Sequence, residues 1–326
     1  MKDTPLDDLL FSVFRSSIAK CNIDPALVED ICVGNVLNGN AANLARGAAL
    51  AAGYPNTTAL SVCNRFCSSG LLATQTIANA IREGSIDIGL AVGAESMSQD
   101  GARDSPDFGE NLMKHQEAKD CLQPMLQTSE NVAVEFNIAR ESQDEFAALS
   151  YNLAEAAQKF GDFDEEIVPV ETYFEDPKSG ERKKITVSKD DGIRYGTTKE
   201  ALAKVRPAAP QWGKGYSTGG NSSQVTDGAA CVLLMKRSTA DKLRLPVLAK
   251  FVGATVVGLE PRIMGIGKGV VKIVSSQQAR QNRSPKFLKR LGFEKMKSTC
   301  SKSMKPLLVW PCIAQTNCSW IAERSM

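Results

Sequence analysis

Apolar residues in the first 95 positions recur at helical spacing in three segments, and a short β-like run follows each of them. The predicted helices cover residues 7–22, 41–52 and 71–82, and the predicted strands cover residues 31–36, 59–66 and 86–92. Gly53 and Gly84 lie just beyond the second and third helices, where glycine commonly ends a helix. Because helices and strands alternate at this interval, we expect an α/β fold with a mostly parallel sheet covered by helices.

Residues 96–217 break this rhythm with long polar stretches. Ser142 and Glu145 have the spacing of a capping box, which predicts the start of a helix that runs through Phe160. A hairpin is predicted at residues 167–187, where two β-like runs flank a turn. We interpret the region as an inserted, partly exposed domain.

The alternation of strands and helices resumes after this region. Strands are predicted at 228–235 and 247–257, with a short helix at 238–243 between them. Beyond Gly267 the periodicity fails, and the chain becomes basic and rich in Ser and Gln. We therefore expect one domain at 1–95 and 218–243, an inserted loop domain at 96–217, the start of a further domain at 244–267, and a disordered basic tail at 268–326.

Charge is distributed unevenly along a chain of otherwise ordinary globular composition, with 43% hydrophobic and 23% charged residues. Residues 268–326 hold 12 Lys and Arg against 2 Asp and Glu, whereas residues 1–267 hold 27 against 35. The larger part is therefore acidic, which argues against nucleic-acid binding by it.

The sequence also bears on membranes, secretion and metals. It contains no run of about 18 apolar residues, so we expect no membrane span. The acidic N-terminus lacks the basic and apolar stretch of a signal peptide. Nine cysteines without dense spacing argue for reduced thiols, and because no CxxC pair occurs we expect no metal site.

The strongest candidate for chemistry lies in Ser61–Gly84, where a predicted strand leads through Cys67–Gly70 into a predicted helix. Such a turn exposes Cys67 at a helix N-terminus. There the unpaired N–H groups and the positive end of the helix dipole favour the thiolate, which is the nucleophilic form. On spacing alone, a merely buried cysteine is the more common alternative.

Seven stretches match motifs of the thiolase family in order and spacing. They read VEDICVGNV, NRFCSSG, DIGLAVGAESMS, TSENVA, DGIRYGTT, STGGNSSQVTDGAA and PRIMGIG. Across residues 1–267 the chain resembles thiolases, and it is most similar to the peroxisomal 3-ketoacyl-CoA thiolases. The resemblance implies a thiolase-like fold in which an N-terminal βαβαβαββ half carries an inserted loop domain, a second similar half follows, and two subunits form a homodimer.

The resemblance also implies roles for individual residues. Cys67 matches the nucleophile that takes the acyl group from a 3-ketoacyl-CoA and passes it to coenzyme A, and its main-chain N–H would form half of an oxyanion hole. Arg194 matches a residue near the adenine and phosphates of CoA, although an ordinary surface salt bridge is the alternative. Gly219 and Ser223 match residues along the pantetheine arm, and Met125 matches an apolar pocket residue. No cofactor is implied, because CoA is a co-substrate.

The chain departs from the family pattern in two places. It starts at Met1, after the point where thiolases carry a first strand with an RTP-like motif. The family's second half carries NEAF, GHP and CxG motifs, and none of them occurs in the C-terminal part of this chain. We therefore expect that half to be largely absent. The only histidine, His115, lies in a polar stretch where thiolases have no catalytic residue, and Cys63 is expected to pack inward.

Three functions remain open at this point. The first is an acyltransferase that cleaves 3-ketoacyl-CoA in fatty-acid β-oxidation, impaired in this chain. The second is an inactive truncated thiolase isoform that at most binds CoA or a full-length subunit. The third is a condensing enzyme of fatty-acid or polyketide synthesis, against which TSENVA argues.

The resemblance implies a peroxisomal location. No targeting signal is visible, since Arg324-Ser325-Met326 is not of the SKL type, and the cytoplasm stays open.

Overall fold

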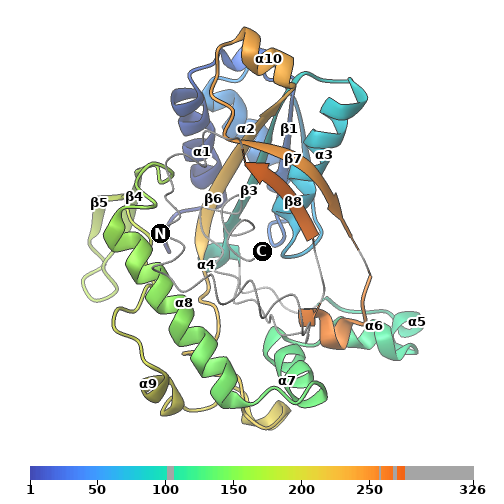
Figure 1. The fold of residues 1–326 in the computed structure, drawn as a ribbon, viewed down its shortest axis with the longest axis vertical. Coiled ribbons are helices and arrows are strands. Elements are labelled where there is room, and N and C mark those ends of the chain that lie inside the picture. Colours follow the sequence, from blue (N-terminus) through green and yellow to red (C-terminus); the bar gives the residue numbers. More distant parts are fainter. Residues whose placement is uncertain (101–105, 257, 267–269, 276–326) are drawn as a thin grey trace.

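The computed structural model describes residues 1–100, 106–256, 258–266 and 270–275, and its largest sheet has the strand order β2-β1-β3-β6 (Figure 1). These strands are β1 (Asp30–Gly34), β2 (Ala59–Cys63), β3 (Ile88–Ser96) and β6 (Asp227–Met235). β1 runs parallel to both β2 and β3, and β6 runs antiparallel to β3. The predicted α/β fold with a mostly parallel sheet is therefore confirmed.

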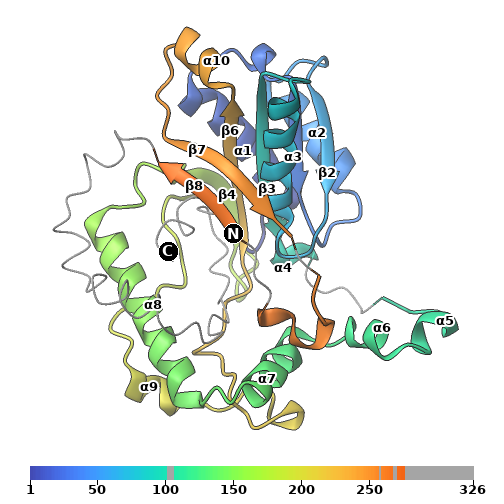
Figure 2. The same ribbon diagram turned by 45° about the vertical axis from the view of Figure 1, so that its right-hand side comes forward.

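Helices cover both faces of this sheet. α1 (Leu6–Cys21) and α2 (Ala41–Ala52) pack on one face, and α3 (Ser69–Glu83) packs on the other (Figure 2). The alternation of side chains along β1 shows the division: Ile31 and Val33 belong to the cluster under α1 and α2, whereas Cys32 belongs to the cluster under α3. All three helices end close to their predicted positions, and Gly53 and Gly84 form the C-caps of α2 and α3.

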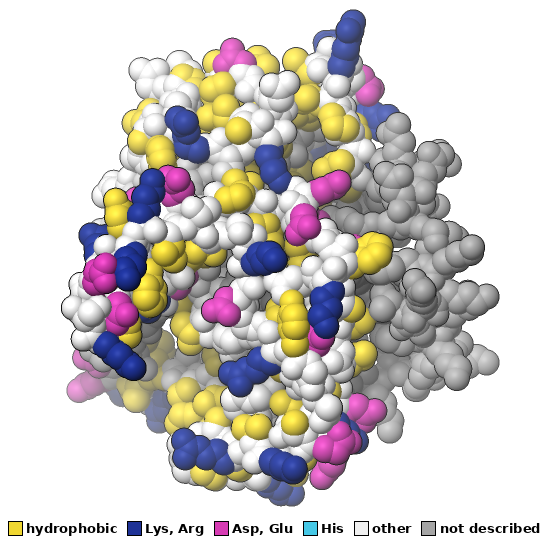
Figure 3. Space-filling view, turned by 90° about the vertical axis from the view of Figure 1, so that its left-hand side faces the viewer, with side chains coloured by type: hydrophobic (Ala, Val, Ile, Leu, Met, Phe, Trp, Pro, Cys, Tyr) yellow, Lys and Arg dark blue, Asp and Glu magenta, His cyan; other side chains and the backbone are white. Residues whose placement is uncertain are grey.

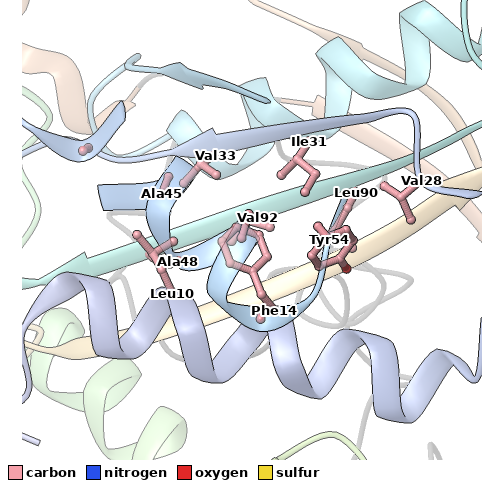
Figure 4. Packing of buried hydrophobic residues seen from close by; sticks show 14 of the residues in the cluster. Leu10, Phe14, Val28, Ile31, Val33, Ala45, Ala48, Tyr54, Leu90 and Val92 are labelled. Atoms are coloured by element: carbon pink, nitrogen blue, oxygen red, sulfur yellow. The ribbon is translucent and has the colours of Figure 1, made fainter. Parts of the chain in front are cut away.

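The larger core lies between α1, α2 and the sheet (Figure 4). Phe14 and Tyr54 meet there edge to face, with ring centroids 5.7 Å apart and an interplanar angle of 70°. The alanines of α2 let α1 and the sheet approach closely. Burying one large apolar side chain such as Phe14 contributes roughly 1.5–3 kcal/mol to folding, so this cluster anchors the sheet that carries the candidate site.

After β6 come α10 (Arg237–Lys242), β7 (Ala249–Thr255) and β8 (Val270–Ser275). β7 and β8 pair antiparallel, and Gln75 of α3 donates a hydrogen bond of 3.2 Å to the carbonyl of Ala254 in β7. Residues 270–275, which the sequence placed in the tail, form β8, and the expectation of a disordered tail at 268–326 stays a prediction. Residues 276–326 of the expected tail lie outside the described residues.

The inserted region contains several short helices, one long helix and a hairpin. Its elements are α4 (Met97–Asp100), α5 (Glu110–Met113), α6 (Gln116–Asp120), α7 (Met125–Glu135), α8 (Arg140–Phe160), β4 (Val170–Glu175), β5 (Arg182–Val187) and α9 (Lys199–Ala203). Within this region a 3-10 helix occurs at Pro210–Trp212. Two more lie elsewhere in the chain, at Pro25–Leu27 and Pro261–Ile266. Figures 1 and 2 place α7, α8 and α9 beyond the C-terminal ends of the parallel strands. The predicted hairpin is confirmed as β4 and β5.

The predicted capping box at Ser142 and Glu145 is wrong. α8 begins three residues earlier, with Ala139 in place of Ser142 as its N-cap and without a side-chain cap. Ser142 already donates its backbone N–H to the carbonyl of Ala139, at 3.2 Å, so it lies inside the first turn. Tertiary contacts explain the earlier start, because Arg140 donates hydrogen bonds to the carbonyl groups of Leu202 and Val205.

Candidate active site

The candidate site lies at the edge of the sheet where the parallel strands end. Gly34, Cys63 and Ser96 are the last residues of β1, β2 and β3, and Asp227, which starts the antiparallel β6, pairs with Ser96 at the same edge. The turn that carries Cys67 leaves this edge after β2, and residues 218–226 reach it before β6. The inserted region lies beyond this edge, so Cys67, the predicted nucleophile, and the predicted CoA-binding loop face the same side of the sheet.

The nucleophile turn, residues 64–69, is closed by its own side chains. Ser69 accepts a hydrogen bond from the N–H of Arg65 at 2.8 Å and donates one to the carbonyl of Phe66 at 2.6 Å. The side-chain oxygen of Asn64 accepts from the N–H of Phe66 at 2.8 Å, and Phe66 adopts a left-handed φ of 49°. This geometry ends β2 at Cys63, three residues earlier than predicted, and turns the chain directly into α3.

Cys67 occupies the outer side of this turn. Its side chain is exposed, and it precedes the N-cap residue of α3, Ser68. Its backbone forms an isolated β-bridge with Arg65 within the turn. The prediction of an exposed cysteine at a helix start is confirmed.

Two glycines of the sheet fix the start of α3, and the sequence reading did not single them out. A Cβ atom added to Gly34 would lie 2.5 Å from the carbonyl carbon of Ser69 and 2.6 Å from the nitrogen of Gly70. A Cβ atom added to Gly93 would lie 3.6 Å from the Cα atom of Gly70. The backbone of α3 therefore rests directly on the backbone of β1 and β3. A glycine at the end of an apolar strand run is the signal that points to such a close approach.

Cys63 and Cys231 are less exposed than Cys67. Burial, together with the neighbouring Cys32, raises the pKa of Cys63 to about 12, and the two Sγ atoms lie 3.7 Å apart. Burial likewise raises the pKa of Cys231 to about 12. The expectation that Cys63 packs inward is confirmed by its place beside the α3 core cluster.

Residues 32–34 spell Cys-Val-Gly and thus have the letters of the CxG motif. Cys32, however, is only 1% exposed and belongs to the core under α3. It cannot meet a substrate there, so this tripeptide does not replace the motif of the second thiolase half.

A half-buried carboxylate, Glu95, stabilises the neighbouring loop. It accepts hydrogen bonds from the N–H groups of Val36 and Leu37, at 2.9 and 3.2 Å, and from the amide of Asn35 at 2.9 Å. Burial is the main cause that raises the pKa of Glu95. The amide of Asn64 donates to the carbonyl of Val36 at 3.1 Å, so this loop and the nucleophile turn are joined.

The residues predicted to bind CoA are all on the surface. Met125 is 57% exposed at the first position of α7. Arg194, Gly219 and Ser223 are exposed on loops. Arg194 forms no ion pair with any described residue, so the alternative of a surface salt bridge is not observed. A Cβ atom added to Gly219 would meet no atom within 4 Å, which leaves open space above its backbone.

The loop of Arg194 is docked on the C-terminal half of α8. The N–H of Gly196 donates to Glu155 at 2.8 Å, the hydroxyl of Tyr195 bonds Gln158, and Lys159 lies 5.0 Å from the centroid of the Tyr195 ring. These contacts hold the backbone of the loop while the guanidinium of Arg194 stays free. The position of Arg194 is therefore set by its neighbours.

The only histidine of the chain lies on the surface. His115 is exposed at the N-cap of α6 and has no contact with the nucleophile turn.

No group of three or more His, Cys, Asp or Glu among the described residues could hold a metal ion. No helix in the described ranges is long and apolar enough to cross a membrane. On the face shown in Figure 3, Lys and Arg are interspersed with Asp and Glu and form no continuous basic surface.

Comparison with known proteins identifies the class. Residues 1–238 match the family model described as "Thiolase, N-terminal domain". The match covers most of the chain, so the chain belongs to the thiolase family.

The individual relatives are peroxisomal 3-ketoacyl-CoA thiolases. The chain is 48% identical to that of Yarrowia lipolytica over 268 residues, which are 82% of this chain and 64% of the relative. It is 48% identical to that of Homo sapiens over 279 residues, which are 85% of this chain and 65% of the relative. The chain thus spans slightly less than two thirds of the length of these relatives.

Solved structures agree with these relatives. The dimeric peroxisomal thiolase of Saccharomyces cerevisiae matches with a TM-score of 0.74 and 43% identity, covering 82% of this chain and 67% of that one. The acetyl-CoA acetyltransferase of Bacillus anthracis matches with a TM-score of 0.66 and 30% identity, covering 81% and 68% of the two chains. The thiolase-like fold of the described part is therefore confirmed.

Proposed function

We propose that this chain is an acyltransferase of the thiolase class that takes the acyl group of a 3-ketoacyl-CoA onto Cys67, as in fatty-acid β-oxidation, and that its complete thiolytic cycle is impaired. The observation that carries the proposal is the exposed Cys67 on a closed turn between β2 and α3. The start of α3 lies beside its sulfur, where an oxyanion would develop, and the main-chain N–H of Cys67 would provide one of its donors.

The chemistry of the first half-reaction needs a thiolate and a proton donor. The Cys67 thiolate attacks the 3-keto carbon, and the bond between C2 and C3 breaks. The electron pair of that bond moves to C2, which takes up a proton, so acetyl-CoA leaves and the shortened acyl group stays on Cys67 as a thioester. In the second half-reaction the thiolate of CoA attacks this thioester, and Cys67 is released.

The binding of CoA is assigned to the inserted region. In this proposal Arg194 contacts the nucleotide end, Gly219 and Ser223 contact the pantetheine arm, and Met125 contributes to an apolar pocket. The free guanidinium of Arg194 and the open space above Gly219 support the assignment. The proposal involves no cofactor, because CoA is itself a co-substrate.

The impairment follows from the acid and base groups that the cycle needs. The only histidine of this polypeptide is His115, which lies on the surface of the inserted region. The only tripeptide with CxG letters is buried in β1. General acid or base assistance is typically worth about 10²–10⁴-fold in rate per group, so the loss of one such group would already leave little turnover.

The test is CoA-dependent loss of the absorbance of the 3-ketoacyl-CoA enolate, with purified protein and a Cys67→Ala control. We expect little or no turnover above that control. Cys67-dependent turnover comparable to that of an intact thiolase would show that the cycle is not impaired.

The second candidate function is an inactive isoform that binds CoA or a full-length thiolase subunit. The missing acid and base groups are the observation that supports this alternative. The two differ in one respect, because only the first forms an acyl thioester on Cys67. No observation favours a condensing enzyme.

Assembly and location are proposed mainly from the relatives. We infer a homodimer, since the Saccharomyces cerevisiae thiolase is dimeric and the outer side of β2 has no strand partner among the described residues. We infer a peroxisomal location because the relatives are named as peroxisomal enzymes. Gel filtration and fluorescence microscopy of the tagged chain test these two inferences.

A further inference from the structure

We propose that Glu130, a residue with no assigned role, is a positioning residue that holds the glycine-rich segment, residues 213–223, in the conformation that receives the pantetheine arm of CoA. This inference rests on the proposed function of the segment. It adds a group that does not touch CoA and acts only through the backbone of the segment.

Glu130 is a buried carboxylate with an unusual set of partners. It lies in the middle of α7, and its exposed fraction is 0%. One oxygen accepts from the N–H of Ser217 at 2.6 Å, and the other accepts from the N–H of Gly215 at 3.1 Å. No Lys or Arg side chain bonds this carboxylate among the described residues. Its charge is therefore satisfied by the backbone of the glycine-rich segment, where hydrogen bonds to an ionised acceptor are strong.

The segment is shaped for this contact. Gly215 has a left-handed φ of 75°, which favours glycine. A Cβ atom added to Gly213 would lie 2.6 Å from a carboxylate oxygen of Glu130, so only glycine lets the backbone pass at this point. The two glycines and the buried carboxylate are thus complementary. A ligand site needs such fixed backbone atoms, because a flexible loop would lose more entropy on binding.

The far end of the segment has a second anchor. The side-chain oxygen of Asn221 accepts from the N–H of Thr218 at 2.7 Å, and its amide donates to Asp144 of α8 at 3.0 Å. Asp144 is only 1% exposed and also pairs with Arg140. Gly219 therefore lies between two anchored positions and is itself exposed with open space above it. The anchors fix the backbone on both sides of the position assigned to pantetheine.

The experiment compares two ligands in the full chain. Glu130→Gln keeps the shape of the side chain but turns an amide N–H group toward one of the two backbone donors. Isothermal titration measures the affinities for CoA and for 3′,5′-ADP, which is the nucleotide half of CoA. We expect a loss of CoA affinity of about 10- to 100-fold, as for a hydrogen bond to a charged group, with unchanged affinity for 3′,5′-ADP.

Two further variants complete the design. Glu135→Gln removes a carboxylate from the same helix without touching the glycine-rich segment, and it should bind CoA as the parent does. Asn221→Ala removes the second anchor and should weaken CoA but not 3′,5′-ADP, which keeps the test informative if Glu130→Gln does not fold. The alkylation rate of Cys67 should be the same in all variants that fold.

The outcomes distinguish a failure of the proposed function from a failure of the role assigned to Glu130. No measurable CoA binding by the parent chain would overturn the proposed function and this inference together. Parent-like CoA binding by Glu130→Gln and Asn221→Ala would overturn this inference alone. An equal loss for both ligands would also overturn it, because it would indicate a general loss of structure and not a displaced pantetheine site.

Discussion

The nucleophile turn and the glycine-rich segment reach the same edge of the sheet, but they are held in different ways. The turn is closed by hydrogen bonds between residues three or four positions apart, and the following helix rests on Gly34 and Gly93. The glycine-rich segment is held by Glu130, which is 85 and 87 positions away from its two partners. The sulfur of Cys67, the proposed nucleophile, is thus fixed by local structure on the sheet, whereas the proposed binding surface depends on long-range polar contacts.

The largest effect is expected in the reactivity of two cysteines that lie four positions apart. Iodoacetamide at mildly acidic pH should label Cys67 well before Cys63. Burial, together with the neighbouring Cys32, raises the pKa of Cys63 to about 12, so at mildly acidic pH very little of it is present as the reactive thiolate. Peptide mapping by mass spectrometry gives the order of labelling.

The exposed Cys121 is the internal control for this comparison. It follows α6 and lies at the C-terminal end of a helix, whereas Cys67 precedes one. We expect it to react more slowly than Cys67 and faster than Cys63. Labelling of Cys63 or Cys231 ahead of Cys67 would refute the assignment of the nucleophile.

The second prediction concerns the support of the nucleophile turn. Gly34→Ala would place a Cβ atom 2.5 Å from the backbone of Ser69, and this backbone cannot move without shifting α3. We expect a loss of roughly 1–3 kcal/mol in the free energy of unfolding, as for overpacked cores, measured by urea denaturation. Gly47→Ala is the matched control.

A Cβ atom at Gly47, in the interior of α2, meets no atom within 4 Å. Alanine there should stabilise the chain by up to about 1 kcal/mol, because it is the better helix former. If the two variants were equally stable, the close approach between β1 and α3 would not matter for the fold.

The smallest effect is expected on the binding side. Arg194→Ala should lower the affinity for CoA about two- to fivefold, since an exposed charge contact contributes at most about 1 kcal/mol. Unlike Glu130→Gln, this variant should also lose affinity for 3′,5′-ADP. Calorimetry measures both ligands, and Arg237→Ala, on the surface of α10, should bind them as the parent does. Unchanged CoA affinity for Arg194→Ala would remove this residue from the site.

The sequence predicted those parts of the molecule that depend on short stretches of chain. Helical periodicity located α1, α2 and α3, and the spacing around Cys67 predicted an exposed cysteine at a helix start. The capping box at Ser142 failed because Arg140, bound to carbonyls more than 60 positions away, starts α8 earlier. Residues 270–275 read VVKIVS, a β-branched run that was passed over because the stretches around it are basic and rich in Ser and Gln.

Contacts between residues far apart in the chain also explain why the sequence could not predict the proposed role of Glu130. Glu130 is a polar residue on a helix, and such residues are mostly exposed. Only the fold brings the N–H groups of Gly215 and Ser217 to its carboxylate. The role proposed for Glu130 could therefore be inferred only once its contacts were known from the structure.

The most direct test of the account is whether Cys67 becomes acylated. The chain is incubated with a 3-ketoacyl-CoA, quenched in acid, and digested for mass spectrometry, with Cys67→Ala as the control. We predict a thioester of the shortened acyl group on Cys67 and on no other described cysteine, even where turnover is undetectable. A chain that binds the 3-ketoacyl-CoA yet leaves Cys67 unmodified, or carries the acyl group on Cys63 or Cys121, would contradict the account.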